Sequence, residues 1–389
     1  MKKLINLGCK LNQYEGYCLL KRYSGAEDVV VVNTCCVTHE AEIKSLKKYR
    51  YALRTFKNAT VIVTGCLCRM YPEKFSGAHQ IIDNVARNAL IADVLPTPER
   101  SRYFLKIEDG CVSTCTFCVV RNVRQVVESK SLEDVEREIG WAVAHGYHEI
   151  VLVGANIGLY GRERGLSLAT LLEHLATIPD MPRIRLSSLE PSFVTPDILK
   201  RLRDIPFCRH IHIPIQSADD EVLGRMGRPY RAADLDMTVE LISSQFDDIA
   251  IGADVIVGFP GEDRPAFERT AEFIEQHPFT HIHVFTYSPR PGTEAFTCGD
   301  PVPHHEKKRR SRYLYGMVRE KNYAFRKTLQ EKAFDIVLEK TGPRCAGLTD
   351  NYVRVLLERC PVPGGVVRAL ITDVTRTQTT GQVVPDGTS

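Results

Sequence analysis

The sequence of 389 residues predicts a mixed α/β protein built from three consecutive units. Over most of the chain, short apolar runs alternate with segments of helical periodicity, an order that favours parallel sheets covered by helices. The last part instead holds β-rich runs separated by Gly and Pro, which is typical of a small antiparallel β-barrel. We therefore expect units at residues 1–97, 98–327 and 328–389.

The first unit is predicted to be a parallel-sheet α/β domain. Three apolar runs alternate with two helical patterns, and the second run is four consecutive valines, as expected for a strand buried on both faces. The expected strands are residues 4–7, 29–32 and 60–63, and the expected helices are residues 13–23 and 40–56.

The second unit repeats the strand–helix order six times, which predicts a partial (β/α)6 barrel with functional loops at the carboxyl ends of the strands. A doubly wound sheet is the alternative and places its loops at the same edge. The expected strands are residues 103–107, 149–153, 183–187, 210–215, 250–257 and 281–287, and the expected helices are residues 131–145, 196–203, 232–245 and 264–276. In the third unit, strands are expected at residues 334–338, 352–357 and 366–372.

Composition excludes several classes of protein. Hydrophobic residues make up 43% and charged residues 25% of the chain, as in ordinary globular proteins. No apolar run approaches the ~18 residues of a membrane span, and polar residues interrupt any signal-peptide core near the N-terminus. We expect a cytoplasmic protein with no membrane partner.

Thirteen cysteines are many for that compartment, where thiols more often bind metals or act in catalysis than form disulfides. Cys111, Cys115 and Cys118 lie within one short loop after the strand at residues 103–107. Three thiolates can hold three irons of a [4Fe-4S] cluster and leave the fourth iron open for a cofactor or substrate. A structural zinc with a distant fourth ligand is the alternative.

A second set of cysteines, Cys9, Cys35 and Cys66, follows the three strands of the first unit. Because the carboxyl ends of parallel strands meet at one edge, these thiols are expected to lie together and to bind metal. The alternative is that they pack as small apolar side chains. Strand alternation predicts that the neighbouring Cys36 and Cys68 point away.

The loop triplet, with Phe117 before its last cysteine, resembles the signature of the radical S-adenosylmethionine (SAM) superfamily. Both triplets together resemble the methylthiotransferase family over nearly the whole chain. The segments that carry this resemblance are residues 7–15, 33–35, 64–66, 111–118, 186–191, 212–217, 254–262 and 287–293.

The resemblance implies a radical SAM enzyme with two [4Fe-4S] clusters and SAM as cofactors. It assigns catalysis to the cluster held by Cys111, Cys115 and Cys118, and an auxiliary, sulfur-carrying cluster to Cys9, Cys35 and Cys66. A radical derived from SAM would activate a C–H bond that then receives a methylthio group.

Residues that follow the barrel strands are the expected SAM contacts, because glycine admits a ligand to the backbone and polar side chains can bond it. Turn or capping roles are the alternative for each. They are Gly154, Asn156, Ser188, Glu190, Gln216 and Gly258. The pairs His210 and His212, and His281 and His283, each share one strand face, where structural roles are expected.

One segment departs from the family pattern. Residues 119–125 lack the proline and glycine that usually follow the third loop cysteine, so we expect a loop of different shape there.

A basic, aromatic segment at residues 305–327 suits RNA, since nine Lys and Arg residues oppose only Glu306 and Glu320. A solvated helix face is the alternative. Residues 347–355 resemble the TRAM domain, an RNA-binding barrel.

Within the family, residues 8–15 and 283–293 are most similar to the threonylcarbamoyladenosine tRNA branch. This implies methylthiolation of C2 of that adenosine in the anticodon stem-loop of tRNA. It also implies a reducing electron donor, such as flavodoxin or ferredoxin, and a sulfur source. The alternatives are isopentenyladenosine tRNA, an aspartate of a ribosomal protein, or a non-catalytic, metal-stabilised RNA-binding protein.

Overall fold

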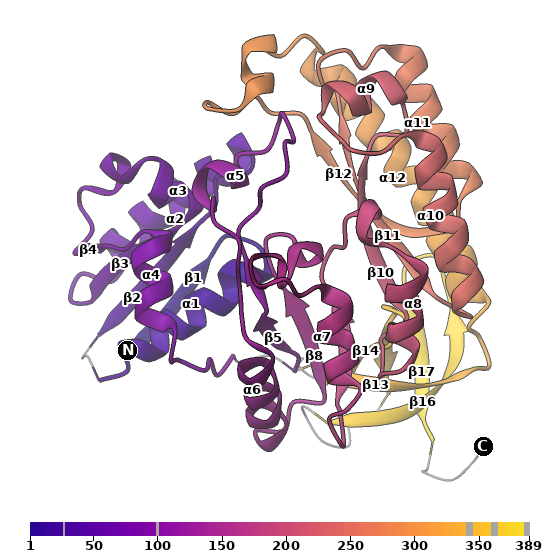
Figure 1. The fold of residues 1–389 in the computed structure, drawn as a ribbon, viewed down its shortest axis with the longest axis horizontal. Helices are drawn as coiled ribbons and strands as arrows, with labels where there is room; N and C mark the ends of the chain where they lie inside the picture. The colour runs from indigo at the N-terminus through magenta and orange to yellow at the C-terminus, as the bar shows by residue number, and fades with distance from the viewer. Residues whose placement is uncertain (26–27, 99–100, 340–344, 359–364, 385–389) are drawn as a thin grey trace.

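The computed structural model describes residues 1–25, 28–98, 101–339, 345–358 and 365–384. Its three parts are a parallel sheet at the left of Figure 1, a curved parallel arrangement of strands in the centre, and a small barrel at the lower right. The mixed α/β class predicted from the sequence is confirmed. Among the described residues, no helix is both long enough and apolar enough to cross a membrane.

The N-terminal sheet has four parallel strands in chain order. Its strands are β1 (Lys2–Asn6), β2 (Val29–Thr34), β3 (Thr60–Gly65) and β4 (Gln80–Ile81), and its helices are α1 (Lys10–Arg22), α2 (His39–Thr55), α3 (Cys66–Met70) and α4 (Asn84–Ile91). The three predicted strands are confirmed. Helix α1 begins earlier than predicted, directly after Cys9, which occupies its N-cap position.

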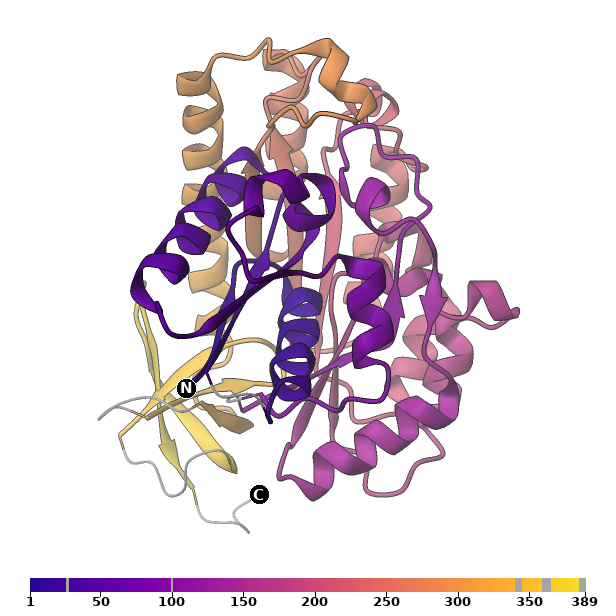
Figure 2. The same cartoon turned by 90° about the vertical axis from the view of Figure 1, so that its left-hand side faces the viewer.

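Helix α1 joins this sheet to the central strands. Its apolar residues, including Leu11 and Leu19, share one core with strand residues of the N-terminal sheet and with Phe104 and Val151 of the central strands. Figure 2, seen from the side of the N-terminal sheet, shows that sheet in front of the central strands. This packing brings the carboxyl ends of both sets of strands near each other.

The central strands form two parallel three-stranded sheets, β5-β8-β9 and β10-β11-β12, joined by an isolated parallel bridge from Ile184 to Phe207. Because strand order follows chain order with no reversal, the arrangement is the partial barrel and not the doubly wound sheet. The strands are β5 (Tyr103–Lys106), β8 (Glu149–Val153), β9 (Arg183–Leu186), β10 (His210–Gln216), β11 (Ala250–Val257) and β12 (Phe279–Thr286).

Helices cover the outside of these strands, and the apolar core lies between the two layers. The alternation on β10 shows this, since Ile211, Ile213 and Ile215 belong to that core whereas His210 and His212 take the other face. The helices are α6 (Leu132–Ala144), α7 (Leu168–Leu175), α8 (Pro196–Arg203), α10 (Ala232–Gln245), α11 (Arg264–Gln276) and α12 (His304–Lys327). Shorter elements in the loops are β6 (Glu108–Asp109), α5 (Val120–Val123), β7 (Glu128–Ser129) and α9 (Asp220–Arg225).

The C-terminal part is a closed barrel of order β13-β14-β15-β17-β16. Its strands are β13 (Ala333–Glu339), β14 (Cys345–Thr349), β15 (Arg354–Leu357), β16 (Val366–Val374) and β17 (Thr379–Val383). The predicted strand at 352–357 begins two residues late because Tyr352 has a φ of 64° and forms a turn. Cys345, the first residue of β14, is disulfide-bonded, although the sequence favours cysteines that bind metals or act in catalysis over disulfides.

Candidate functional site

The loop with Cys111, Cys115 and Cys118 lies between β6 and α5, against the carboxyl ends of the barrel strands. The loop backbone is held by Met226, whose carbonyl accepts a hydrogen bond of 3.0 Å from the Thr116 N–H. Cys118 opens on a cavity of about 220 Å³. We call this the loop cavity; its lining includes Val37, Phe117, Cys118, Gln216, Asp254, Phe285 and Tyr287.

The loop thiols lie near enough to influence one another, with Cys115 buried and Cys111 and Cys118 partly buried. Burial, reinforced by the neighbouring Cys115 and Cys111, raises the pKa of Cys118 to about 11. Burial also raises the pKa of Cys115, but Arg228 opposes the rise because its Nη1 lies 2.9 Å from Sγ. Burial therefore favours the neutral thiols of Cys115 and Cys118, and a bound cationic group would stabilise their thiolates.

The second triplet gathers as the parallel sheet predicts. Cys9, Cys35 and Cys66 line one cavity of about 410 Å³, which we call the triplet cavity. Residues of α1 and of the barrel complete its wall: Lys10, Leu11, Asn12, Val37, Val120, Arg124, Val153, Gly154, Ala155, Ser187 and Ser188. Burial, reinforced by the nearby Cys66 and Cys9, raises the pKa of Cys35 to about 12.

The prediction for Cys36 is wrong. Its thiol donates a hydrogen bond to Cys66, and this bond, together with Arg124 and Arg87, lowers the pKa of Cys66 to about 6 against the effect of burial. Strand β2 ends at Thr34, so the alternation that would turn Cys36 away no longer applies. Cys68 does point elsewhere, with Sγ 3.7 Å from the Val63 carbonyl oxygen.

The spacing of the thiols does not fit a single metal ion. Zn–S bonds of about 2.3 Å would bring tetrahedral ligands within about 4 Å of one another. Among the described residues, sets of three ligand atoms that all lie within 4.8 Å consist of histidines and Asp254, and neither cysteine triplet is among them. A multi-iron cluster needs no such close approach, because each of its three thiolates binds a different iron.

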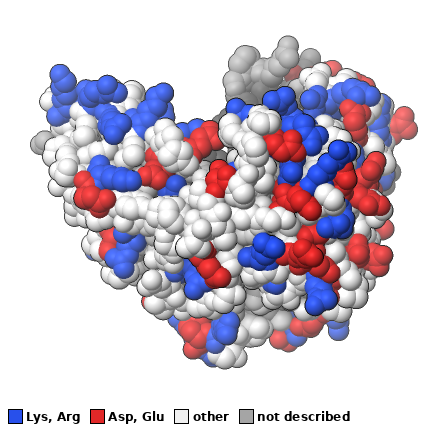
Figure 3. All heavy atoms as spheres, turned by 90° about the horizontal axis from the view of Figure 1, so that it is seen from above, with Lys and Arg blue, Asp and Glu red and all other residues white. Residues whose placement is uncertain are grey.

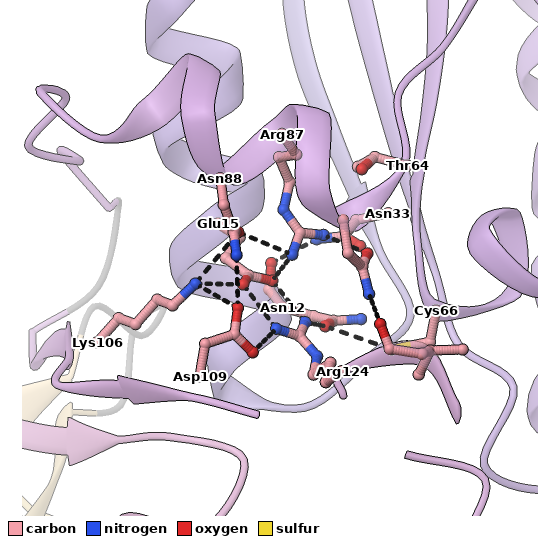
Figure 4. Close-up of polar contacts among 12 residues, drawn as sticks. Asn12, Glu15, Asn33, Thr64, Cys66, Arg87, Asn88, Lys106, Asp109 and Arg124 are labelled. Carbon is pink, nitrogen blue, oxygen red and sulfur yellow. Dashed lines mark hydrogen bonds and ion pairs between the residues drawn. The ribbon is translucent and has the colours of Figure 1, made fainter. Parts of the chain in front are cut away.

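A buried network of charged side chains lies next to the triplet cavity, and Arg124 belongs to both (Figure 4). Glu15 of α1 is fully buried and lies 2.7 Å from Arg124, 2.7 Å from Arg87 and 2.9 Å from Lys106. Although burial opposes it, these three cations lower the pKa of Glu15 to about 2. Arg124 also pairs with Asp109 and donates a 2.8 Å hydrogen bond to Asn12, so it ties the loop after the cysteines to the N-terminal domain.

Arg124 lies in the segment that departs from the family pattern. Residues Val120–Val123 form the short helix α5, and the Arg124 carbonyl accepts a 3.0 Å hydrogen bond from the Cys111 N–H. This segment thus connects both cysteine sets. Neither Arg124 nor Arg228 is identifiable from the sequence, because each acquires its role from contacts with distant segments.

Three of the six predicted SAM contacts lie near the cysteine loop. Gln216 lines the loop cavity and ends β10 at a φ of 65°. Asn156 donates a 3.0 Å hydrogen bond to Glu190, which pairs at 3.0 Å with the same Arg228 that contacts Cys115.

The remaining three contacts lie elsewhere. Gly154 and Ser188 line the triplet cavity. Gly258 has a φ of 75°, and a Cβ there would lie 2.5 Å from the Lys307 side chain, so this glycine makes room for a protein side chain.

The four histidines face one another across β10 and β12. His210 and His281 approach to 3.1 Å through their Nε2 atoms, and His212 and His283 lie 2.9 and 3.1 Å from Asp254. The absence of a side chain at Gly252 leaves room for this group, since a Cβ there would lie 2.2 Å from His281. The histidines thus bond each other and Asp254, as a structural role requires.

Glu108 provides a pH-dependent test of this region. Its buried carboxylate accepts a 2.9 Å hydrogen bond from the Asn156 N–H, and burial, reinforced by Asp109, raises its pKa to about 8. A carboxyl group whose folded pKa exceeds its unfolded pKa destabilises the fold as pH rises between the two values, here from about 4.5 to 8.

We expect Glu108→Gln to remove part of that loss. In urea unfolding, we compare the free energies of unfolding of the variant and of wild type at pH 5 and at pH 8. The difference between the two proteins should shift in favour of the variant by at least about 1 kcal/mol between these pH values, because one pKa unit corresponds to about 1.4 kcal/mol. The exposed Glu73→Gln is the matched control. Parallel stability curves for wild type and Glu108→Gln would contradict the assignment.

Comparisons with known proteins agree with this geometry. Residues 105–274 match the profile described as Radical SAM superfamily, and residues 3–86 match that of Uncharacterized protein family UPF0004. Among solved structures, the radical S-adenosylmethionine methyltransferase TsrM from Kitasatospora setae has a TM-score of 0.55 at 13% identity and covers 76% of each chain. That likeness shows the fold alone.

Curated relatives extend over nearly the full length. A threonylcarbamoyladenosine tRNA methylthiotransferase of Thermotoga maritima is 34% identical, with 87% of this chain and 86% of that protein covered. The corresponding protein of Bacillus subtilis is 32% identical, with 90% and 89% covered. A tRNA-2-methylthio-N(6)-dimethylallyladenosine synthase of Clostridium tetani is 30% identical, with 85% and 84% covered. On this similarity and on both cysteine sets, the chain belongs to the radical SAM methylthiotransferase family.

Proposed function

We propose that this enzyme methylthiolates C2 of N6-threonylcarbamoyladenosine beside the anticodon of tRNA. One observation carries the proposal: the cavity lined by Cys118 adjoins the cavity lined by Cys9, Cys35 and Cys66, since Val37 lines both of them. A base placed there would reach both metal centres at once. The Thermotoga maritima and Bacillus subtilis relatives, named for this tRNA substrate, support the choice among substrates.

The donor sets fit two [4Fe-4S] clusters, each with three protein thiolates and one open iron. We assign the SAM-binding cluster to Cys111, Cys115 and Cys118 and the auxiliary cluster to Cys9, Cys35 and Cys66. When bound, the clusters and SAM supply the electron, the radical, the sulfur and the methyl group that methylthiolation of an unreactive C–H bond requires.

The protein's own residues hold and shield these groups. Arg228 places a positive charge 2.9 Å from the Cys115 sulfur, and its second contact to Glu190 extends toward Asn156. We assign the binding of SAM to Gln216, Asn156 and Glu190 on this connection to the loop cysteines. The assignment of Gly154, Ser188 and Gly258 to SAM binding is supported only by their positions at the ends of barrel strands.

Basic surfaces flank the cavities where an RNA loop would enter. In α12, Lys307 and Arg310 are buried and paired with Asp300 and Glu262, so less of its charge is free than the sequence predicts. Tyr313 and Tyr315 of this helix are 53% and 42% exposed and are available to contact bases.

Helix α2 adds a basic surface that sequence reasoning missed: Lys44, Lys47, Lys48, Arg50 and Arg54. Seen from above (Figure 3), Lys and Arg side chains gather at the upper left, the side of the N-terminal sheet in Figure 1. Such surfaces suit the phosphates of an anticodon stem-loop.

We further propose that the work is divided among three domains, 1–97, 98–327 and 328–389. The first would hold the auxiliary cluster, the second SAM and its cluster, and the third, a TRAM-like barrel, the RNA. An external reductant such as flavodoxin or ferredoxin and a sulfur source would be partners, in the cytoplasm.

The decisive experiment is nucleoside analysis of tRNA from a strain that lacks the gene. We expect the 2-methylthio derivative of threonylcarbamoyladenosine to vanish and its precursor to accumulate, with restoration by the wild-type gene. Loss of the methylthiolated isopentenyladenosine instead would assign the other tRNA substrate. Unchanged tRNA nucleosides would overturn the proposal.

A further inference from the structure

The triplet cavity is lined by a lysine whose ammonium group is unpaired in the described part of the chain. Lys10 is the first residue of α1 and lines the cavity beside Cys9. Among the described residues it makes no hydrogen bond and no ion pair. Arg124, the other cation on this wall, is neutralised by Glu15 and Asp109.

The surroundings of Lys10 carry excess positive charge. Arg102 and Arg185 both lie near enough to repel its ammonium group. Arg185 is fully buried and is itself neutralised by Glu149, at 2.7 Å, so Glu149 is already engaged. A half-buried cation without a counter-ion is unfavourable, and a bound anion would relieve that cost.

We propose that Lys10 binds the carboxylate of the threonylcarbamoyl group of the substrate base. The inference rests on the proposed function, because that group supplies a carboxylate and a hydroxyl attached to N6 of the adenine. Lys10 directly follows Cys9 and lines the same cavity, so it lies beside the position that the base would take to receive sulfur from the auxiliary cluster. Ser187, on the barrel side of the same cavity, offers a hydroxyl for the polar remainder of the group.

Two other anions are alternative counter-ions for the ammonium group of Lys10. A phosphate of the tRNA would do so irrespective of the base modification, and the cluster with its thiolates carries negative charge of its own. Only a contact to the carboxylate makes the lysine sensitive to the chemistry at N6. The test therefore compares two tRNAs that differ only in that group.

The holoenzyme with SAM is titrated with tRNA carrying threonylcarbamoyladenosine and with the same tRNA carrying isopentenyladenosine, which has no carboxylate. We expect Lys10→Gln to weaken binding of the first tRNA by about tenfold to a hundredfold, as for loss of one charge-assisted hydrogen bond. Binding of the second should change by less than about twofold. Lys10→Arg should recover part of the loss, and Lys200→Gln, at an exposed lysine of the outer helix α8, is the matched control.

Equal weakening of both tRNAs by Lys10→Gln would overturn the inference and assign the lysine to a phosphate. If Lys10→Gln leaves binding of both tRNAs unchanged but alters the absorption of the auxiliary cluster, the inference is overturned and the lysine pairs with the charge of the cluster. The proposed function is judged separately. Wild-type enzyme that forms no methylthio product on threonylcarbamoyladenosine tRNA refutes that function, whereas product formation with no Lys10 selectivity refutes only the carboxylate site.

Discussion

Replacing Cys115 by alanine is expected to abolish reductive cleavage of SAM, whereas replacing Cys35 by alanine is expected to leave that cleavage largely intact and to abolish methylthio transfer. Cys115 belongs to the loop that faces Gln216 across the loop cavity, and Cys35 belongs to the triplet cavity beyond Val37. Because Cys115 belongs to the set assigned to the cluster that binds and reduces SAM, the first loss should be at least about 10³-fold. The loss of methylthiolated nucleoside in Cys35→Ala should be equally large.

Both activities are measured on anaerobically reconstituted enzyme, as 5′-deoxyadenosine release and as methylthiolated nucleoside. Iron content should fall from about eight to about four atoms per chain in each variant. Cys298→Ala, at an exposed free cysteine, is the control for the substitution itself. If both variants lost both activities equally, the two cysteine sets would not be functionally separate.

Arg124→Met should destabilise the protein by about 3–5 kcal/mol at neutral pH. The substitution leaves Glu15, which is fully buried, without its principal cation and Asp109 without one of two. Removing one partner of a buried ion pair leaves an uncompensated charge in a medium that solvates it poorly. Packing of the methionine side chain does not replace that interaction.

Arg121→Met is the matched control, since Arg121 is exposed on the same segment and should change stability by less than about 0.5 kcal/mol. Unfolding of the two variants is followed in urea at pH 7 and pH 3. The pKa of Glu15 is held near 2, so its stabilising effect is complete above about pH 4.5 and is lost as pH falls through 2. The deficit of Arg124→Met should therefore shrink at pH 3, and a deficit that grows there would contradict the network.

Much of the fold could be predicted because its signals are local. The bounds of β8, β11, α8, α10 and α11 follow directly from the apolar patterns and their flanking capping residues. The two-residue strand β4 and the five-residue helix α3 were missed, because a periodicity needs more residues than these elements contain. Cys36 was misplaced because strand alternation was extended past the end of β2.

The sequence by itself determined the two cysteine sets, since spacing places three thiols on one loop and parallel strands bring Cys9, Cys35 and Cys66 to one edge. Only the tertiary structure decided the charges around them. Packing of segments about a hundred residues apart brings Arg228 to Cys115 and Arg124 to Glu15. It also leaves Lys10 without a partner among the residues that the structure describes. Whether an ion is paired depends on which side chains meet in space, and local sequence pattern carries no record of that.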